Sequence, residues 1–158
     1  MPLAELQADY VLTFDFDRRA SLYLTYHAHG DRRQRGIELV RLKRRFAAAG
    51  LVLAEGELPD YLPALLEFAA LAPEEDGEAL LAEHRPALEL VRSALHGRGS
   101  RYAQLLDALV ACLPPLTPAQ EARARRLAEE GPPVELVGLD PVVSLPAEIA
   151  GGVSRGVS

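Results

Sequence analysis

The stretch at residues 57–70, ELPDYLPALLEFAA, indicates the fold class most directly. After two acids and a proline it becomes an apolar segment with helical spacing. Asp60 suits the N-cap, because its carboxylate can accept hydrogen bonds from free backbone N–H groups, and Pro63 is tolerated in the first turn. We therefore expect a helix that begins after Asp60 and ends near Ala72 and Pro73.

The same periodicity recurs on both sides of this stretch. Apolar residues three and four apart predict further helices at residues 3–14, 31–49, 80–97, 100–113 and 117–130. The intervening LVLAEGE at 51–57 has no helical pattern and predicts a connecting loop. No alternating strand of useful length occurs, so the expected fold is all-α, a single-domain helical bundle.

Capping and breaking residues support these boundaries. Asp31 suits the N-cap of the second helix, and Gly50 follows that helix where a left-handed residue is wanted. Ser100 can cap a later helix, and Pro86 should kink or split the helical region around it. Residues 117–120, TPAQ, combine a capping-box spacing with proline at the first helical position.

The chain divides into two regions by pattern. Residues 1–131 form the predicted helical domain, and residues 132–158 form an irregular tail that we expect to be mobile. The tail is rich in proline and small residues and has no sustained period. Its segment LVGLDPVVSL could also dock in extended form along an apolar groove.

Composition limits the functional class. The net charge of −6 disfavours nonspecific nucleic-acid binding. A single cysteine excludes an internal disulfide framework and fits a reducing compartment. No apolar run approaches the roughly 20 residues that span a bilayer, and the N-terminus has no signal-peptide pattern. We therefore expect a soluble, cytoplasmic protein that does not insert into membranes.

Charge is unevenly distributed along the chain. Seven basic residues lie on or beside the second predicted helix: Arg32, Arg33, Arg35, Arg41, Lys43, Arg44 and Arg45. The following residues, 55–89, are rich in acids. This pattern fits either a solvated basic face opposite an acidic neighbour, or an acidic surface that receives a basic peptide. A nucleic-acid-binding helix is disfavoured, because no aromatic platform accompanies the arginines.

Few residues suggest chemistry. His27 and His29 are two residues apart, so on a helix their imidazoles point away from each other, and no further Cys/His pair completes a metal site. Cys112 lies among apolar residues, which predicts a buried, inert thiol. No phosphate-binding loop pattern is present. We expect no metal, no bound cofactor and no enzymatic activity.

The acids of the opening stretch allow three interpretations. Capping explains Asp60 but not Glu57, which lies too far upstream to cap the same turn. A catalytic pair would need a third group, a nucleophile or a metal, and none is evident. The rim of a binding site accounts for both carboxylates without requiring catalysis.

Several motifs in the same order resemble one family. SLYLTYHAHGDRRQRG, LVRLKRRF, ELPDYLPALLEF, EHRPALELVRSAL and SRYAQLLDAL are similar to the molybdenum-cofactor assembly chaperones of respiratory nitrate reductase. This is the delta-subunit or NarJ-type branch of the redox-enzyme maturation chaperones. The resemblance covers about residues 6–131, and family members carry further helical sequence upstream, so Met1 is a candidate for a trimmed or misplaced start.

The resemblance implies a function. It implies a non-catalytic helical chaperone that binds the catalytic (alpha) subunit of nitrate reductase, including its N-terminal segment. The chaperone holds that subunit competent for molybdenum-cofactor insertion before membrane docking, and we expect a monomer or weak homo-oligomer. The alternative from the residues themselves is a helical adaptor or regulatory module whose arginine-rich helix binds an acidic partner.

The resemblance also implies where the client binds. The family's acidic-Pro-Asp-His element corresponds to Glu57, Pro59, Asp60 and Tyr61, with tyrosine in place of the usual histidine. Tyrosine can still stack and donate a hydrogen bond. The family's aromatic loop corresponds to Ser21, Leu22, Tyr23 and Tyr26. The expected client-binding residues are Tyr23, Tyr26, Glu57, Pro59, Asp60, Tyr61 and Leu62.

Overall fold

The computed structural model describes residues 2–30 and 33–131. Within these ranges the chain forms eight α-helices and one short 3-10 helix, which confirms the all-α prediction. In chain order they are α1 (Leu3–Phe14), η1 (Arg18–Ala20), α2 (Leu24–His29), α3 (Arg33–Ala48), α4 (Leu62–Leu71), α5 (Glu74–Glu83), α6 (Arg85–Gly97), α7 (Ala103–Ala111) and α8 (Pro118–Glu130). The predicted N-cap Asp31 and the predicted tail at 132–158 lie outside the described residues.

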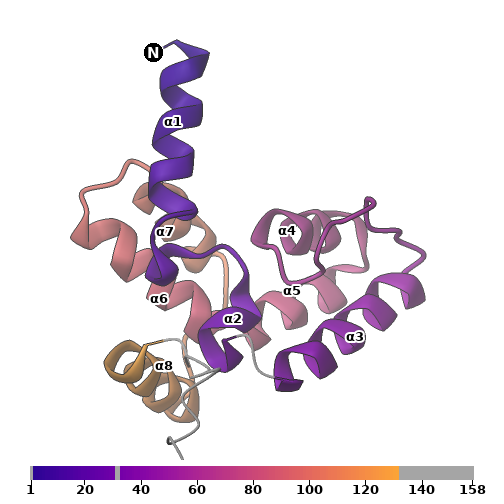
Figure 1. Ribbon diagram of the computed structural model, residues 1–158. Coiled ribbons are helices and arrows are strands. Elements are labelled where there is room, and N and C mark those ends of the chain that lie inside the picture. The colour runs from indigo at the N-terminus through magenta and orange to yellow at the C-terminus, as the bar shows by residue number, and fades with distance from the viewer. Residues whose placement is uncertain (1, 31–32, 132–158) are drawn as a thin grey trace, which may run out of the picture.

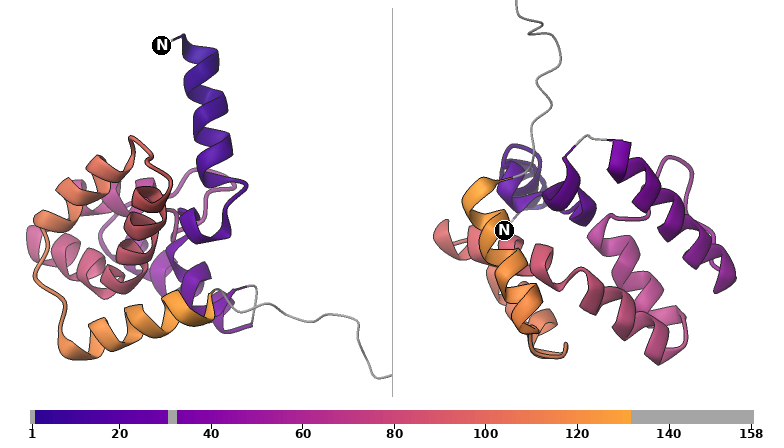
Figure 2. Two further views of the ribbon diagram at one scale, coloured as in Figure 1. Left: turned by 90° about the vertical axis from the view of Figure 1, so that its left-hand side faces the viewer. Right: turned by 90° about the horizontal axis from the view of Figure 1, so that it is seen from below.

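Helix α6 is the centre of the arrangement. Helices α7 and α8 both pack against it, as do η1 and α2. Helix α4 packs against α5, and α3 contacts α2 (Figure 1). Helix α1 projects from this body, as Figure 1 and the left view of Figure 2 show. Among the helices of the described ranges, none combines the length and apolar character needed to cross a bilayer.

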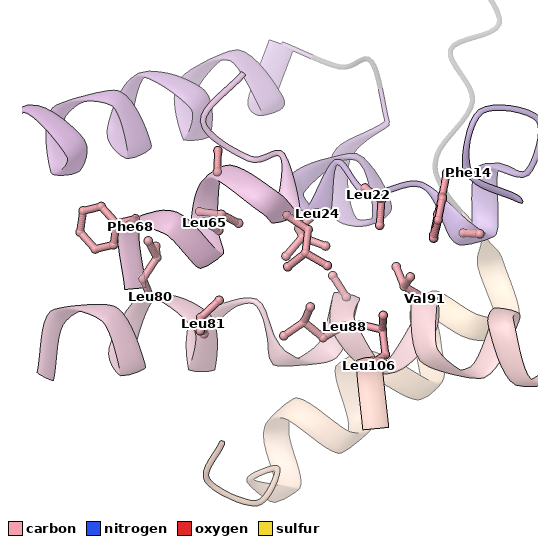
Figure 3. Packing of buried hydrophobic residues seen from close by; sticks show 14 of the residues in the cluster. Phe14, Leu22, Leu24, Leu65, Phe68, Leu80, Leu81, Leu88, Val91 and Leu106 are labelled. Atoms are coloured by element: carbon pink, nitrogen blue, oxygen red, sulfur yellow. The ribbon is translucent and has the colours of Figure 1, made fainter. Parts of the chain in front are cut away.

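The hydrophobic core runs through the molecule from the α4–α5 pair to α6 (Figure 3). Phe68 and Leu80 lie at one end and Val91 and Phe14 at the other, with Leu88 between them (Figure 3). Leu80, Leu88 and Val91 have no exposed surface. Such full burial stabilises each side chain by about 1.5–3 kcal/mol relative to exposure, so this row holds the helices together.

The local signals at the helix ends are confirmed. After α3, the amide of Leu51 donates to the Phe46 carbonyl and that of Gly50 to Ala47, which forms a Schellman motif with Gly50 at a φ of 73°. Thr117 and Gln120 form the predicted capping box. Helix α5 ends at Glu83 and α6 begins at Arg85 with Pro86 in its first turn, so the predicted break is a split into two helices.

Two predictions from the sequence are wrong. Asp60 is not an N-cap, because the N-cap of α4 is Tyr61 and no side chain caps that helix. Cys112 is exposed instead of buried. A third differs in detail: α7 begins at Ala103, and the Ser100 hydroxyl accepts a hydrogen bond from the Tyr102 amide in the turn before it.

Two close contacts matter for the site and for stability. Tyr10 and Phe14 of α1 pack on each other and on Tyr102, with ring centroids 4.8–6.3 Å apart, which fixes the base of α1 to the body. Helices α4 and α5 meet where Gly77 approaches the backbone of Ala69. A Cβ atom at Gly77 would lie 2.7 Å from the Ala69 Cα, so only glycine fits there without a shift.

Candidate functional site

The two segments that the sequence analysis singled out are joined at the starts of α2 and α4. Tyr23 and Tyr61 form an isolated antiparallel bridge. The Leu24 amide donates to the Asp60 carbonyl and the Leu62 amide to the Leu22 carbonyl, each at 2.9 Å. This pair of hydrogen bonds brings the aromatic loop and the acidic-proline element into one site.

Asp60 lies beneath this bridge and has no exposed surface. Its Oδ2 accepts a hydrogen bond from the Thr25 hydroxyl at 2.5 Å and another from Nη2 of Arg35 at 3.2 Å. Arg35 Nε also donates to the Thr25 hydroxyl oxygen at 3.3 Å. The other carboxylate oxygen, Oδ1, is buried without a hydrogen-bond partner among the described residues. The Asp60 side chain therefore connects α2, α3 and the start of α4.

Arg35 contacts both the buried Asp60 carboxylate and the tyrosines at the surface. Its guanidinium carbon lies 5.8 Å from the ring centroid of Tyr23 and 5.8 Å from that of Tyr26. Both distances are within the range of a cation–π contact. The ring of Tyr23 lies 5.3 Å from that of Tyr61, whose hydroxyl forms a 2.7 Å hydrogen bond with the Tyr10 hydroxyl.

A cavity of about 320 Å³ opens beside these rings. We call it the tyrosine cleft, and its lining residues are Phe14, Asp15, Asp17, Arg18, Ser21, Tyr23, Tyr26 and Arg35. Asp15 is an exposed acid at this cleft, whereas Asp17 is already paired with Arg98 at 2.6 Å. The cleft thus combines aromatic faces with an available carboxylate.

Burial favours the neutral phenol at two tyrosines near the cleft, Tyr23 and Tyr10. Burial, followed by the nearby Tyr61 and Asp60, raises the pKa of Tyr23. Burial and the hydrogen bond with Tyr61 also raise the pKa of Tyr10. Protonated phenols can donate to a carbonyl oxygen and stack on a side chain, which are contacts that suit a peptide.

The structure brings together some of the predicted client-binding residues and separates others. Tyr23 and Tyr26 lie against Arg35 in the cleft, and Tyr61 packs on Tyr23 beside it. Asp60 lies beneath them, and Pro59 and Leu62 are buried like it. Glu57 is half-buried and borders a different groove, so it is not part of the tyrosine cleft.

Three residues of the site were not singled out from the sequence as binding residues. Arg35 was one of seven basic residues in a run, Thr25 was one polar residue of a short helix, and Asp15 lies in the loop after α1. No local signal distinguishes Arg35 from its neighbours. Its partner Asp60 is 25 positions away in the chain, so only the fold identifies the pair.

The interpretation of a basic helix opposite an acidic neighbour is confirmed for two arginines. Arg41 and Arg45 of α3 bind Glu83 of α5 at 3.1 and 2.7 Å. These arginines lower the pKa of Glu83 although its partial burial acts in the opposite direction. The pairs are partly exposed, so each contributes at most about 1 kcal/mol.

The histidines serve as structural groups. The Nε2 atom of His27 lies 2.8 Å from the Ser21 carbonyl oxygen, and Nδ1 of His84 lies 2.9 Å from that of Leu80, so each ring nitrogen donates to a carbonyl. Burial lowers the pKa of both rings. No group of three or more His, Cys, Asp or Glu side chains within the described ranges is placed to hold a metal ion.

The buried His27 predicts a pH dependence of stability. The pKa of His27 is lower in the folded protein than the unfolded value of about 6.5, because burial outweighs the attraction of Asp17 and Asp60. The unfolded chain then binds more protons, so the free energy of unfolding falls as the pH drops through about 6.5, by up to about 1.4 kcal/mol per pH unit for one such group. Urea denaturation at neutral and mildly acidic pH measures this change. A His27→Gln variant should show a smaller slope; an equal or steeper slope contradicts the assignment.

The described part of the chain is thus an all-helical protein with a cleft of aromatic and acidic side chains, lined by the end of α1, the loop around η1, α2 and α3. The family model of the nitrate reductase delta subunit matches residues 1–108. The chain belongs to this family.

Curated relatives agree with this family. The chain is 42% identical over 104 residues to the probable nitrate reductase molybdenum cofactor assembly chaperone NarJ of Bacillus subtilis, covering 66% of this chain and 56% of that protein. It is 41% identical over 106 residues to NarJ of Escherichia coli K12, a nitrate reductase molybdenum cofactor assembly chaperone, covering 67% of this chain and 45% of that protein. The chain thus spans about half the length of these relatives. Their names describe assembly chaperones and not enzymes, in agreement with the prediction of a non-enzyme.

Proposed function

We propose that this protein is a chaperone for the assembly of a molybdenum-cofactor-containing nitrate reductase. It binds the catalytic subunit, including the N-terminal segment of that subunit, in the cytoplasm. It holds the subunit competent for cofactor insertion until the subunit docks at the membrane. Membership of the delta-subunit family and the names of the curated relatives support the assembly role.

The tyrosine cleft is the observation that supports client binding. Tyr23 and Tyr26 offer aromatic faces, and Asp15 offers a carboxylate to a basic side chain of the client. Aromatic anchors in a cleft contribute much of the binding energy at protein interfaces. The buried Pro59, Asp60 and Leu62 then act by holding the tyrosines in place, without contacting the client themselves.

The arginine-rich helix is poorly suited to the alternative role of binding an acidic partner. Arg35 is largely buried against Asp60, and Arg41 and Arg45 are paired with Glu83. An acidic partner would have to displace these carboxylates. For these three arginines, pairing within the chain therefore argues against the adaptor role.

Capture of the client tests the assembly role. The tagged protein, expressed in cells that respire nitrate, should copurify the nitrate reductase catalytic subunit. Cells that lack the chaperone should accumulate a catalytic subunit without its molybdenum cofactor. The role is refuted if the subunit is absent from the captured fraction and acquires its cofactor normally without the chaperone.

Variants of the cleft test the binding site. We expect Tyr26→Ala to weaken binding of a synthetic peptide of the client's N-terminal segment about tenfold or more, as at interface positions of high energy. Asp15→Asn should weaken binding about two- to fivefold, because it removes one exposed ion pair. Calorimetric titration measures both affinities.

The control for these variants is Leu71→Ala, which changes a 62% exposed side chain of α4 outside the tyrosine cleft. Thermal melts of all three variants show whether each one folds as the parent does. Parental affinity in both cleft variants means that the client segment binds elsewhere.

A further inference from the structure

A second, separate groove lies between the end of α3 and the loop that follows it. It holds about 480 Å³ and is lined by Lys43, Phe46 and Ala47 of α3 and by residues 51–58. We call it the loop groove. It shares no lining residue with the tyrosine cleft, and it contains Glu57, which the cleft leaves unexplained.

The lining of the loop groove is apolar and alternates between buried and exposed side chains. Phe46 is buried, and Leu51 and Leu53 are half-buried. Between them the Val52 side chain is 95% exposed, and Ala54 is exposed as well. Alternation with a period of two is typical of a strand-like segment with one face on the protein.

The backbone of this segment offers unpaired groups. Within the described part of the chain, the amides of residues 52–55 donate to no other backbone group. The carbonyl groups of Val52 and Leu53 accept from none. A segment with free N–H and C=O groups beside an apolar groove can pair with an added extended peptide, as in β-strand addition.

The charges around the loop groove indicate which kind of peptide would bind there. Glu55 and Glu57 border it, and neither forms an ion pair with a residue in the described ranges. The C-terminal end of α3 adds partial negative charge. Lys43 is the single basic residue among those that line the groove. The balance favours an apolar segment with basic side chains.

We propose that the loop groove binds an extended, apolar segment of the client with basic side chains, by backbone pairing with residues 52–55. That the segment comes from the client rests on the proposed function. The chaperone then holds its client at two places, with the tyrosine cleft binding one segment and the loop groove another. Two weak contacts on one molecule give tighter binding than either alone.

A synthetic hexapeptide of alternating valine and arginine, capped at both ends, is the probe. Titrated into the isotope-labelled full chain, it should shift the amide signals of residues 51–58 more than those of Tyr23, Tyr26 and Arg35. A matching hexapeptide of valine and glutamate should bind at least about tenfold more weakly, because its charges are repelled. Two further probes carry N-methyl groups on the amides of one backbone edge or of the other. Only the probe methylated on the edge that pairs with residues 52–55 should lose affinity.

Matched variants of the protein locate the site. Ala47→Arg places a bulky cation in the groove and should weaken binding of the arginine probe about tenfold or more. Ala48→Arg changes an exposed neighbour in the same helix, outside the groove, so its affinity for the probe should stay within about twofold of that of the parent. Glu57→Gln should weaken it about two- to fivefold. Equal binding by Ala47→Arg and Ala48→Arg, or by the acidic and basic probes, overturns the proposal.

Client capture separates this proposal from the proposed function. With the chaperone role intact, Ala47→Arg should capture less catalytic subunit than Ala48→Arg does. If both capture the subunit as the parent does, the loop groove is not a client site, although the chaperone role stands. If the parent captures none, cells without it still load the cofactor normally, and the basic probe still shifts residues 51–58, the chaperone role fails and the client is excluded as the source of the segment.

Discussion

The Asp60→Asn variant should lose about 3 kcal/mol of unfolding free energy, since breaking a buried ion pair from one side is strongly destabilising. The carboxylate is fully buried, while the side chain of Arg35 keeps only 16% of its exposure. The substitution removes the negative charge and leaves the arginine's charge buried. Asp60→Ala should cost at least as much, because the Thr25 hydroxyl also loses its acceptor. Urea denaturation at neutral pH measures each loss.

A double-mutant cycle identifies the partner. If the Arg35–Asp60 pair is the cause, Asp60→Asn combined with Arg35→Met should cost less than the sum of the single variants, by at least about 1 kcal/mol. Glu83→Gln is the control, because its ion pairs with Arg41 and Arg45 are partly exposed and should contribute at most about 1 kcal/mol each. A loss below about 0.5 kcal/mol in Asp60→Asn would falsify the role assigned to the pair.

Gly77→Ala and Gly36→Ala should change stability in opposite directions. At Gly77 the new Cβ would lie 2.7 Å from the Ala69 Cα and 2.8 Å from its carbonyl oxygen, so α4 and α5 must move apart. Overpacking of this kind costs about 1–3 kcal/mol. At Gly36, on an exposed part of α3, no atom lies within 4 Å, and alanine should gain about 0.5–1 kcal/mol of helix stability.

Thermal melts and urea titrations of the two glycine variants measure these changes. Both substitutions add one methyl group to a helical position, so their difference isolates the contact between α4 and α5. Far-ultraviolet circular dichroism shows whether Gly77→Ala keeps its helices. Equal shifts of the same sign in both variants would mean that the two helices do not pack at Gly77 as described.

The fold could be predicted where the signal is local. Gly50, Pro86 and the capping box at residues 117–120 each act on their own neighbours, and all three predictions are confirmed. Apolar periodicity gave most of the helices for the same reason, but it missed α2 and the first part of α5, which begins at Glu74 and not near residue 80. Asp60 shows the limit of local signals, because its hydrogen-bond partners are 35 and 25 residues away in the chain.

Cys112 shows a second limit. Helix α7 and its flanks are apolar nearly all round, so periodicity does not reveal which face packs against α6. Leu106 is buried, and Cys112 follows six residues later, about 240° further around the helix at about 100° per residue. It therefore faces away from the core. Leu105, next to the buried Leu106, is 65% exposed for the same reason.

The candidate site could be predicted only in part. The resemblance to the chaperone family pointed to the tyrosines and to Asp60, and the structure places Tyr23, Tyr26 and Asp60 around Arg35. Because Glu57 and Asp60 are close in sequence, the sequence predicts that they form one acidic rim. In the structure they lie in different places: Asp60 is buried, and Glu57 lines the loop groove.

The bridge between Tyr23 and Tyr61 has a consequence for the order of folding. Helix α2 has six residues, and isolated helices shorter than about 12–15 residues are marginal in water. Its first amide is held by the Asp60 carbonyl, which is made much later in synthesis. The emerging chain therefore cannot complete the tyrosine cleft until Leu62 has left the ribosome. The pairing that sets Tyr23 beside Tyr61 therefore forms late in synthesis, after both segments have emerged.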